Sequence, residues 1–479
     1  MIPLLLILVP LVSGLLTFFL KKEGMARSFA LLASLATLVV SVAGIAFVKD
    51  AASLSYSADW IPALGTKFSV SLDGMGQLLG LLTAIAFPVI FIATWNSSYS
   101  KSYNFFGLML LSQTGLMGVF LATDALLFYF FWELALIPAY FLCSGWGGEK
   151  RIAVTFKFFI YTFIGSLLML VGIIYIYFKT PNLSFALNDF YALALTSADQ
   201  SWLFWMFFVA FAIKMPIFPF HTWQPDTYYV APTPGVMMLS GIMSKMATYG
   251  LIRWVLPMVP QGIEEYGYIL IVLSVISILY ASFISIVQKD FKYLIAYSSI
   301  AHMGLISAGI IACNAQSLQG SLMEMLSHGI NTVGLFFVLD IIFLRMGTSE
   351  MKQLGGIRGL DSSFAFLFFI IVLSVVALPF TNGFVGEFLL IIGLFQANAI
   401  AASFAGLSII LGVVYMFRSY QTMMLGETNQ LTAGFTKLTM QEKITLIIIV
   451  TLIIGLGVYP KIVLGITEGS VQTLLQGIQ

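Results

Sequence analysis

The feature that most constrains this chain is a series of apolar stretches, each long enough to cross a lipid bilayer as an α-helix. One crossing needs about twenty predominantly apolar residues. Charged residues make up only 9% of the chain and hydrophobic residues 60%, with a mean hydropathy of +1.00. Because a soluble domain carries roughly a quarter charged residues, the composition predicts an all-α integral membrane protein.

We expect about fourteen transmembrane helices with no soluble domain between them. The first stretch has no basic segment before it and no small-residue cleavage site after it, so we interpret it as a retained span. The predicted helices are Ile2 to Leu20, Phe29 to Val48, Met75 to Trp95, Phe105 to Ala122, Ala125 to Ser144, Ile152 to Phe178, Trp202 to Phe220, Pro234 to Leu256, Tyr268 to Val287, Tyr293 to Cys313, Leu322 to Leu344, Phe364 to Phe395, Ala401 to Leu425 and Ile444 to Leu464.

Lysine and arginine are distributed unevenly between the loops that join these helices. Cytoplasmic loops of membrane proteins collect basic residues, so the richer set of alternate loops marks the inner side. This places both termini outside, on the periplasmic side. The richer set carries Lys21, Lys22, Arg27, Lys101, Lys150, Arg151, Lys289, Lys292, Arg345, Lys352, Arg358, Lys437 and Lys443, with Arg418 nearby, whereas the other carries only Lys49, Lys67, Lys179, Arg253 and Lys461.

Prolines interrupt the seventh and the twelfth predicted helices, at Pro216 and Pro379. Proline removes a backbone donor and breaks or kinks a helix, and paired broken helices are typical of transporters with a midplane ion site. Their spacing of five helices predicts two repeats of inverted topology, although kinks without function are also common. The predicted units are 1–104 (helices one to three), 105–258 (first repeat), 259–425 (second repeat) and 426–479 (helix fourteen).

Four ionisable residues lie well inside predicted spans: Glu133, Lys214, Lys245 and Glu387. Each costs on the order of 2.5–3.5 kcal/mol at the bilayer centre, so it must be paired, hydrated or used. Lysine suits a proton store, because burial disfavours its charged form while a nearby carboxylate favours it. The alternative is a passive scaffold in which these charges only hold helices together.

Two histidines occupy predicted helices ten and eleven, His302 and His328. Imidazole can accept and donate a proton near neutral pH, and Glu324 stands four residues before His328 on the same helix face. Together they predict a proton relay. Two alternatives remain, namely packed histidines bonded to carbonyl groups and a haem held between the two rings.

Other charged residues lie at the ends of the predicted spans. Lys157 follows Arg151 closely and is either an anchor in the lipid interface or part of the relay. Asp124 is expected to be a solvated cap of helix five, with an outer proton mouth as the alternative. Asp340 is expected to pair with Arg345 as a structural contact, and His221 begins a loop that either gates proton uptake or ends its helix.

Nothing in the sequence supports a redox or nucleic-acid site. No glycine triplet stands between a strand and a helix as in dinucleotide-binding folds. The two cysteines, Cys143 and Cys313, are too few to hold an iron–sulfur cluster. A net charge of +1 offers no electrostatic footprint for nucleic acid. If redox energy drives this protein, other subunits must supply it.

Several segments carry a specific resemblance that extends over nearly the whole chain. They resemble the M-type antiporter-like subunits of proton-translocating NADH:quinone oxidoreductase, respiratory complex I, known as chain 4 in mitochondria. The segments are Phe131-Trp-Glu133-Leu-Ala-Leu-Ile-Pro138, Lys157-Phe-Phe-Ile-Tyr-Thr162, Phe218-Pro-Phe-His221-Thr-Trp, Ala231-Pro-Thr-Pro234-Gly and Phe384-Val-Gly-Glu387-Phe.

The resemblance implies roles for the buried residues. Glu133 would pair with Lys214, Lys245 would be central, and Glu387 would face the exit, with both histidines between them. Glu387 points to the M-type subunit, because sister subunits usually carry lysine there. One loop departs from the family pattern, which usually has leucine and histidine where this chain has Gln224 and Tyr228.

The resemblance also implies a setting. The chain would be a non-redox subunit of a translocase in the bacterial inner membrane rather than the mitochondrial one, and would pass protons while quinone is reduced elsewhere. It would hold no cofactor or metal, with NADH, FMN, iron–sulfur clusters and quinone in partner subunits. Homologous antiporter-like subunits and other membrane-arm subunits would flank it within the lipid. The alternative is the equivalent subunit of a multi-subunit sodium/proton antiporter or a membrane-bound hydrogenase.

Overall fold

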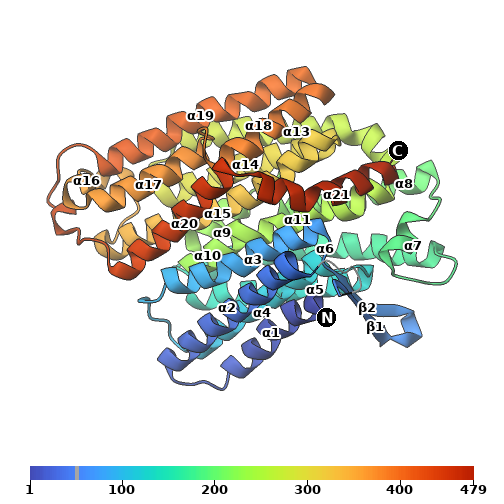
Figure 1. Ribbon diagram of the computed structural model, residues 1–479. Helices are drawn as coiled ribbons and strands as arrows, with labels where there is room; N and C mark the ends of the chain where they lie inside the picture. Colours follow the sequence, from blue (N-terminus) through green and yellow to red (C-terminus); the bar gives the residue numbers. More distant parts are fainter. Residues whose placement is uncertain (49–52, 479) are drawn as a thin grey trace.

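The computed structural model describes residues 1–48 and 53–478 as an elongated bundle of helices (Figure 1). Among these residues, ten helices are long and apolar enough to cross a membrane, which confirms the predicted fold class. They are α2 (Glu23–Phe47), α3 (Gly74–Ala93), α4 (Ser102–Leu121), α5 (Ala125–Trp146), α6 (Arg151–Lys179), α13 (Pro260–Val287), α14 (Phe291–Ala312), α15 (Ala315–Met346), α19 (Ala399–Met424) and α20 (Met440–Val458).

The remaining helices are shorter, and some of them complete the bundle. The apolar ones are α1 (Ile2–Thr17), α8 (Ser197–Lys214), α17 (Ser362–Val375) and α18 (Asn382–Ala397). Surface or connecting helices are α7 (Leu187–Tyr191), α9 (Gln224–Val230), α16 (Ile357–Leu360) and α21 (Lys461–Ile478), with 3₁₀ turns at Pro62–Leu64, Met351–Gln353 and Thr432–Gly434.

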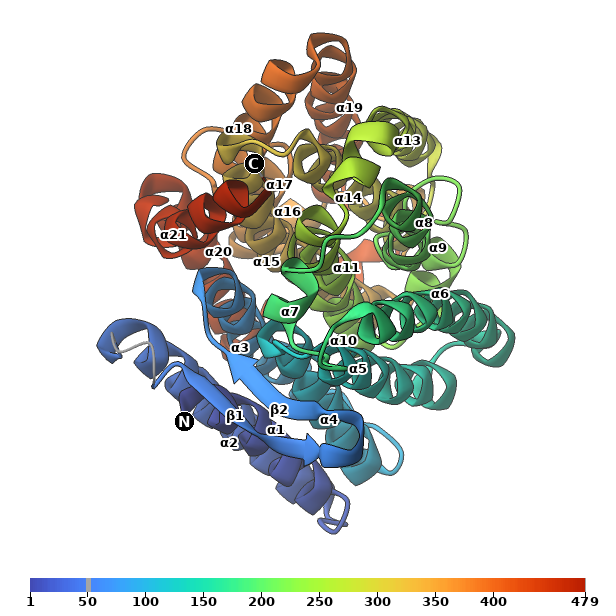
Figure 2. The same cartoon turned by 90° about the vertical axis from the view of Figure 1, so that its right-hand side faces the viewer.

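Burial separates central helices from peripheral ones. In their most apolar windows α14 is 89% buried and α15 83%, whereas α2 and α19 are only 33% buried. Viewed along the bundle, α15 and α11 lie near the middle while α2, α6 and α19 form the rim (Figure 2). Polar residues on α14 and α15 are therefore shielded from lipid by the surrounding helices.

Both predicted helix breaks are present. α8 ends at Lys214 and α9 begins only at Gln224, so Pro216 lies in the break. Likewise α17 ends at Val375 and α18 begins at Asn382. The division into two five-helix repeats stays a prediction.

The predicted helix Pro234 to Leu256 is less regular than its sequence suggested. It is a helical run of α10 (Thr233–Met238), a π-helical segment Leu239–Met243, α11 (Ser244–Gly250), a second π-helical segment Leu251–Val255 and α12 (Leu256–Met258). A π-helical turn pairs each carbonyl with the amide five residues later and often marks a functional site. Lys245 follows the first of these segments directly.

The C-terminal boundary of helix fourteen was predicted wrongly. Instead of continuing to Leu464, α20 ends at Val458, because Pro460 cannot continue a helix. The separate helix α21 buries Val463, Thr467 and Val471 on one face. The Thr467 hydroxyl donates to the side-chain oxygen of Gln319 on α15 at 2.7 Å, so α21 is held along the side of the bundle (Figure 1).

A small antiparallel hairpin, β1 (Ser55–Ile61) and β2 (Thr66–Ser71), is an addition to the expected all-helical fold. It contacts Asp124, which caps α5 by accepting from the amides of Leu126 and Leu127 at 3.0 Å each. Asp124 also accepts from the Thr66 hydroxyl and the Lys67 amide, each at 3.0 Å. The carboxylate is a cap, as predicted, but it is buried rather than solvated, and burial raises its pKa above the ordinary value.

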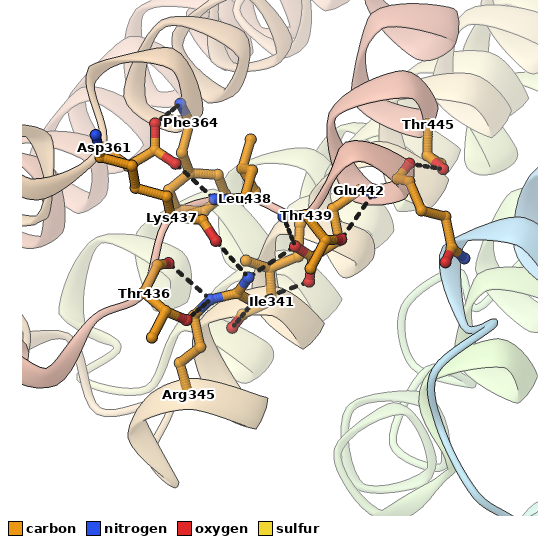
Figure 3. Close-up of polar contacts among 11 residues, drawn as sticks. Ile341, Arg345, Asp361, Phe364, Thr436, Lys437, Leu438, Thr439, Glu442 and Thr445 are labelled. Carbon is orange, nitrogen blue, oxygen red and sulfur yellow. Dashed lines mark hydrogen bonds and ion pairs between the residues drawn. The ribbon is translucent and has the colours of Figure 1, made fainter.

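The expected pair of Asp340 with Arg345 is wrong. Asp340 accepts instead from the Thr233 hydroxyl at 2.6 Å. Arg345 forms a bidentate ion pair with Glu442 on α20, at 2.7 and 2.9 Å (Figure 3). Its guanidinium also donates to the carbonyl of Thr436, so the end of α15, the start of α20 and the segment between α19 and α20 are tied together.

The start of α1 and the end of α21 lie at the same end of the bundle, and the hairpin is beside the start of α1 (Figure 1). The turn with Lys21 and Lys22 and the helix α16 with Arg358 lie at the opposite end. We call this opposite end the basic end. The arrangement matches the alternation of basic and non-basic loops that the sequence predicts.

Candidate functional site

The first group of ionisable side chains lies at the break after α8. Lys214 is the last residue of α8 and is 2% exposed, and its ammonium makes no hydrogen bond in the described part of the chain. It lies 5.2 Å from the centre of the Trp132 ring, a cation–π distance. Glu133 on α5 interacts with it through space, without a hydrogen bond to the Lys214 ammonium. The predicted pair therefore consists of neighbours rather than contact partners.

The second group begins at Lys245, which is fully buried on α11. Its Nζ donates to the carbonyl of Ser240 at 2.6 Å and lies 2.6 Å from Nδ1 of His328 on α15. Ser240 belongs to the first π-helical segment, and the irregular turn brings its carbonyl to the ammonium. A lysine ammonium can only donate, so Nδ1 of His328 accepts whenever Lys245 is charged, and the proton of the neutral ring then sits on Nε2.

His302 on α14 continues the group. Its ring centre lies 5.5 Å from that of His328. Its Nδ1 is 3.3 Å from a carboxylate oxygen of Glu387 on α18 and 3.5 Å from one of Glu324 on α15. One nitrogen thus faces two carboxylates, and Glu324 retains a second oxygen without a partner in the described residues. An imidazole between two carboxylates can pass a proton to either of them.

Two small cavities flank His302, each of about 10 Å³. That is about the room needed for one water molecule. One cavity is shared with His328 and Glu324. The other is shared with Glu387 and Ser408, whose hydroxyl has no hydrogen-bond partner among the residues that the structure describes. Polar walls give such a water its hydrogen-bond partners, so water can extend the chain on both sides of His302. Neither cavity has room for a porphyrin.

The same three side chains have the composition of a cation site. The ligand atoms of His302, Glu324 and Glu387 lie within 4.8 Å of one another. Histidine and carboxylates are common ligands of divalent metals. The distance of 3.3 Å from His302 to Glu387 is close to hydrogen-bond length, so we interpret the cluster as a site of proton exchange.

The predicted residues thus fall into two groups and one outlier. Glu133 and Lys214 form the first group, and no hydrogen bond in the described part of the chain joins it to the second. Lys157 belongs to neither group. It is 39% exposed and donates to the carbonyl of Thr222 at 2.8 Å. The second group, which we call the buried relay, consists of Lys245, His302, Glu324, His328 and Glu387.

Sequence reasoning missed the hydroxyls around the buried relay. The Ser240 hydroxyl lies 3.3 Å from that of Ser299, and the Tyr415 hydroxyl 3.1 Å from that of Ser298. Serine and tyrosine occur in many of the predicted spans, so their presence alone gives no signal for these four positions. The available signal is their position within about one helical turn of a buried ionisable residue, as for Ser240 before Lys245 and Ser299 before His302.

Comparison with known proteins assigns this arrangement to a family. Residues 122–412 match the family model described as NADH:quinone oxidoreductase/Mrp antiporter, transmembrane region. NADH-quinone oxidoreductase subunit M of Rickettsia typhi is 37% identical over 98% of this chain and 97% of its own length. The chain belongs to this family. All residues of the buried relay fall inside the matched segment, and the resemblance inferred from the motifs is confirmed.

Solved structures share this fold over the full length of the chain. One chain of respiratory complex I from Thermus thermophilus with bound NADH superposes with a TM-score of 0.91 at 28% identity, over 99% of this chain and 100% of that one. A chain of the Mrp complex from Dietzia gives a TM-score of 0.89 at 21% identity, over 100% and 98%. At that identity the Mrp likeness concerns the fold alone.

Proposed function

We propose that this chain is the M-type membrane subunit of a bacterial NADH:quinone oxidoreductase and that it passes protons across the membrane through its buried relay. The relationship to subunit M and the likeness to a complex I chain support the assignment. The observation that carries the mechanism is the succession from Lys245 through His328 and His302 to Glu387. Lys245 Nζ lies 2.6 Å from Nδ1 of His328, the two imidazole ring centres are 5.5 Å apart, and Nδ1 of His302 lies 3.3 Å from a carboxylate oxygen of Glu387.

The geometry suggests how a proton moves. Lys245 stores the proton and passes it to Nδ1 of His328, which it already contacts. From there the proton crosses to His302 through the water in the shared cavity, and His302 passes it to Glu387. Lys214 acts on Lys245 from a distance, through its charge. Moving Glu133 relative to Lys214 changes how strongly Lys214 holds its own proton, and therefore changes that charge.

The remaining parts of the proposal concern the setting. NADH, FMN, iron–sulfur clusters and quinone belong to partner subunits, and this chain adds no redox group of its own. The exposed apolar faces of α2 and α19 contact lipid or neighbouring antiporter-like subunits. The basic end faces the cytoplasm and both termini face the periplasm, in keeping with the positive-inside rule.

The decisive experiment compares variants of the assembled complex in inverted membrane vesicles. We expect Lys214→Ala and Glu133→Ala to abolish NADH-driven proton uptake, while NADH oxidation by a soluble artificial acceptor continues and reports assembly. Lys461→Ala, an exposed lysine at the other end of the bundle, is the matched control and should pump normally. Normal pumping by assembled Lys214→Ala and Glu133→Ala complexes would refute the proposal.

A separate measurement addresses the sodium/proton antiporter and hydrogenase alternatives. The native complex is purified through this chain and its subunits are identified. We expect NADH-oxidising and iron–sulfur subunits in it. A complex composed only of membrane subunits, or one with a hydrogenase, would overturn the assignment to NADH:quinone oxidoreductase while leaving proton transfer through the relay in place.

A further inference from the structure

The short helix α9 carries an unexplained pair of buried polar residues, Gln224 and Tyr228. They stand four positions apart on one face of the helix, and their exposed fractions are 0% and 1%. Neither the oxygen nor the nitrogen of the Gln224 amide makes a hydrogen bond in the described part of the chain. A buried amide without partners costs about 1–3 kcal/mol, and buried polar groups are nearly always bonded to protein or ordered water. An ordered water beside the Gln224 amide would supply these missing hydrogen bonds.

The Tyr228 hydroxyl leads from this position toward the buried relay. It lies beside the side chains of Gln224 and Ser240, while the ring packs edge-on against Phe336 and Trp223. The ring contacts fix the direction in which the hydroxyl points. Tyr228 thus connects the water position at Gln224 with the π-helical segment that precedes Lys245.

Hydroxyl groups continue this connection as far as the cavity beside His302. The Ser240 hydroxyl is 3.3 Å from the hydroxyl of Ser299 on α14, and both serines are buried. Ser299 lines the cavity that His302 and His328 share. A water in that cavity has a hydroxyl on one side and two imidazoles on the other.

The opposite side of α9 faces the surface at the basic end. Asp226 is 45% exposed and contacts the Lys157 ammonium and the Tyr293 hydroxyl, each at 3.5 Å. The last carbonyl of α9, that of Val230, accepts from the amide of Gly148 in the loop just before Arg151. The short helix α9 therefore carries the half-exposed Asp226 carboxylate on one side and the buried Gln224 and Tyr228 on the other.

We propose that Gln224, Tyr228, Ser240 and Ser299, with water held at Gln224, form the route by which a proton from the basic end reaches the cavity between His328 and His302. This proposal rests on the proposed function and adds the uptake route to it. A proton from the basic end adds to the water, and the water passes one proton to the Tyr228 oxygen while the phenol passes its own proton to Ser240. Ser240 and Ser299 repeat the exchange, so each hydroxyl again carries one proton. His328 receives the last proton and reloads Lys245, which it contacts.

The route explains the two departures from the family pattern together. The resemblance implies leucine and histidine at these two positions, whereas this chain has Gln224 and Tyr228. A phenol relays a proton less readily than an imidazole, because its unperturbed pKa is near 10 rather than near 6.5. The amide of Gln224 offers donors and an acceptor that hold a water against the phenol, and the pair replaces one histidine.

Tyr228→Phe removes the hydroxyl and keeps the ring contacts. We expect NADH-driven proton uptake in inverted vesicles to fall about tenfold or more, while NADH oxidation by a soluble artificial acceptor is unchanged. The matched control is Tyr420→Phe, in which another buried tyrosine loses a hydroxyl that donates to the Ala365 carbonyl at 3.2 Å. The control should pump normally. The double variant Gln224→Leu with Tyr228→His should recover most of the lost uptake, which a purely structural role of the hydroxyl does not predict.

The outcomes separate this proposal from the proposed function. Normal uptake by Tyr228→Phe, in a background where Lys245→Ala abolishes pumping, would overturn the uptake route and leave the function standing. Normal uptake by both variants would overturn the function as well. If Tyr228→Phe does not assemble, Ser240→Ala decides in its place, because it removes only one buried oxygen from the same route, and the same fall in uptake is expected.

Discussion

The sharpest structural prediction concerns Gly386, where α18 packs tightly against α15 beside Glu324. A Cβ at this position would lie 2.5 Å from the Oε2 oxygen of the Glu324 carboxylate and 2.9 Å from both Cα and Cβ of Glu324. Carbon atoms pack best at about 3.5–4.0 Å, so Gly386→Ala must push the two helices apart by roughly 1 Å. Because Glu387 is the next residue, its distance to Nδ1 of His302 grows from 3.3 Å to about 4 Å, beyond hydrogen-bond length.

We expect this single methyl group to impair pumping without removing any ionisable group. Overpacking costs about 1–3 kcal/mol, which an assembled membrane complex tolerates. A misplacement of about 1 Å in a reacting pair costs up to about 10²-fold in rate. NADH-driven proton uptake in inverted vesicles should therefore fall by between about tenfold and about 10²-fold.

The control is Gly406→Ala on α19, where an added Cβ has no neighbour within 4 Å. This variant makes the same substitution in a membrane helix and should pump like the unmodified complex. If Gly386→Ala also pumps normally in an assembled complex, contact between His302 and Glu387 is not needed for transfer. An equal loss in both variants would mean that the effect is not specific to this helix crossing.

Three further predictions follow from single contacts. Arg345→Ala breaks a nearly buried bidentate pair with Glu442 and should destabilise the chain by about 3–5 kcal/mol, visible as a lower unfolding temperature of the purified complex, with a smaller loss for Arg345→Lys. Asp124→Ala should cost about 1–2 kcal/mol through loss of the α5 cap, whereas Asp124→Asn, which keeps an acceptor, should cost less in the same measurement. The absorption spectrum of the purified chain should show no Soret band, because the cavities beside His302 and His328 are too small for haem; a Soret band would contradict the assigned geometry.

Much of the architecture follows from patterns that are local in sequence. Hydrophobic length identified the long spans, and Pro216 and Pro379 located both helix breaks because proline acts within one turn. Glu324 and His328 could be placed on one helix face from their spacing alone. These features depend on the chain's own backbone geometry, so distant residues cannot change them.

The missed features depend on contacts between distant segments. The π-helical turn at Ser240 has no local signature, and it determines where the Lys245 ammonium points. Arg345 pairs with Glu442 rather than with Asp340, because α20 packs beside the end of α15. The Asp340 carboxylate instead accepts a hydrogen bond from the Thr233 hydroxyl. The sequence could likewise not show that Glu133 and Lys214 face each other without touching, because that separation is set by the packing of α5 against its neighbours.

The central claim is that Lys245 serves by gaining and losing a proton, and Lys245→Arg tests it most directly. Arginine keeps the positive charge and the ability to donate to Ser240 and His328, but it does not release a proton at any relevant pH. In an assembled complex we predict that NADH-driven proton uptake through this subunit is lost. Uptake at the unmodified rate would show that a fixed charge is sufficient at this position, and the relay would then be a scaffold of charges rather than a path for protons.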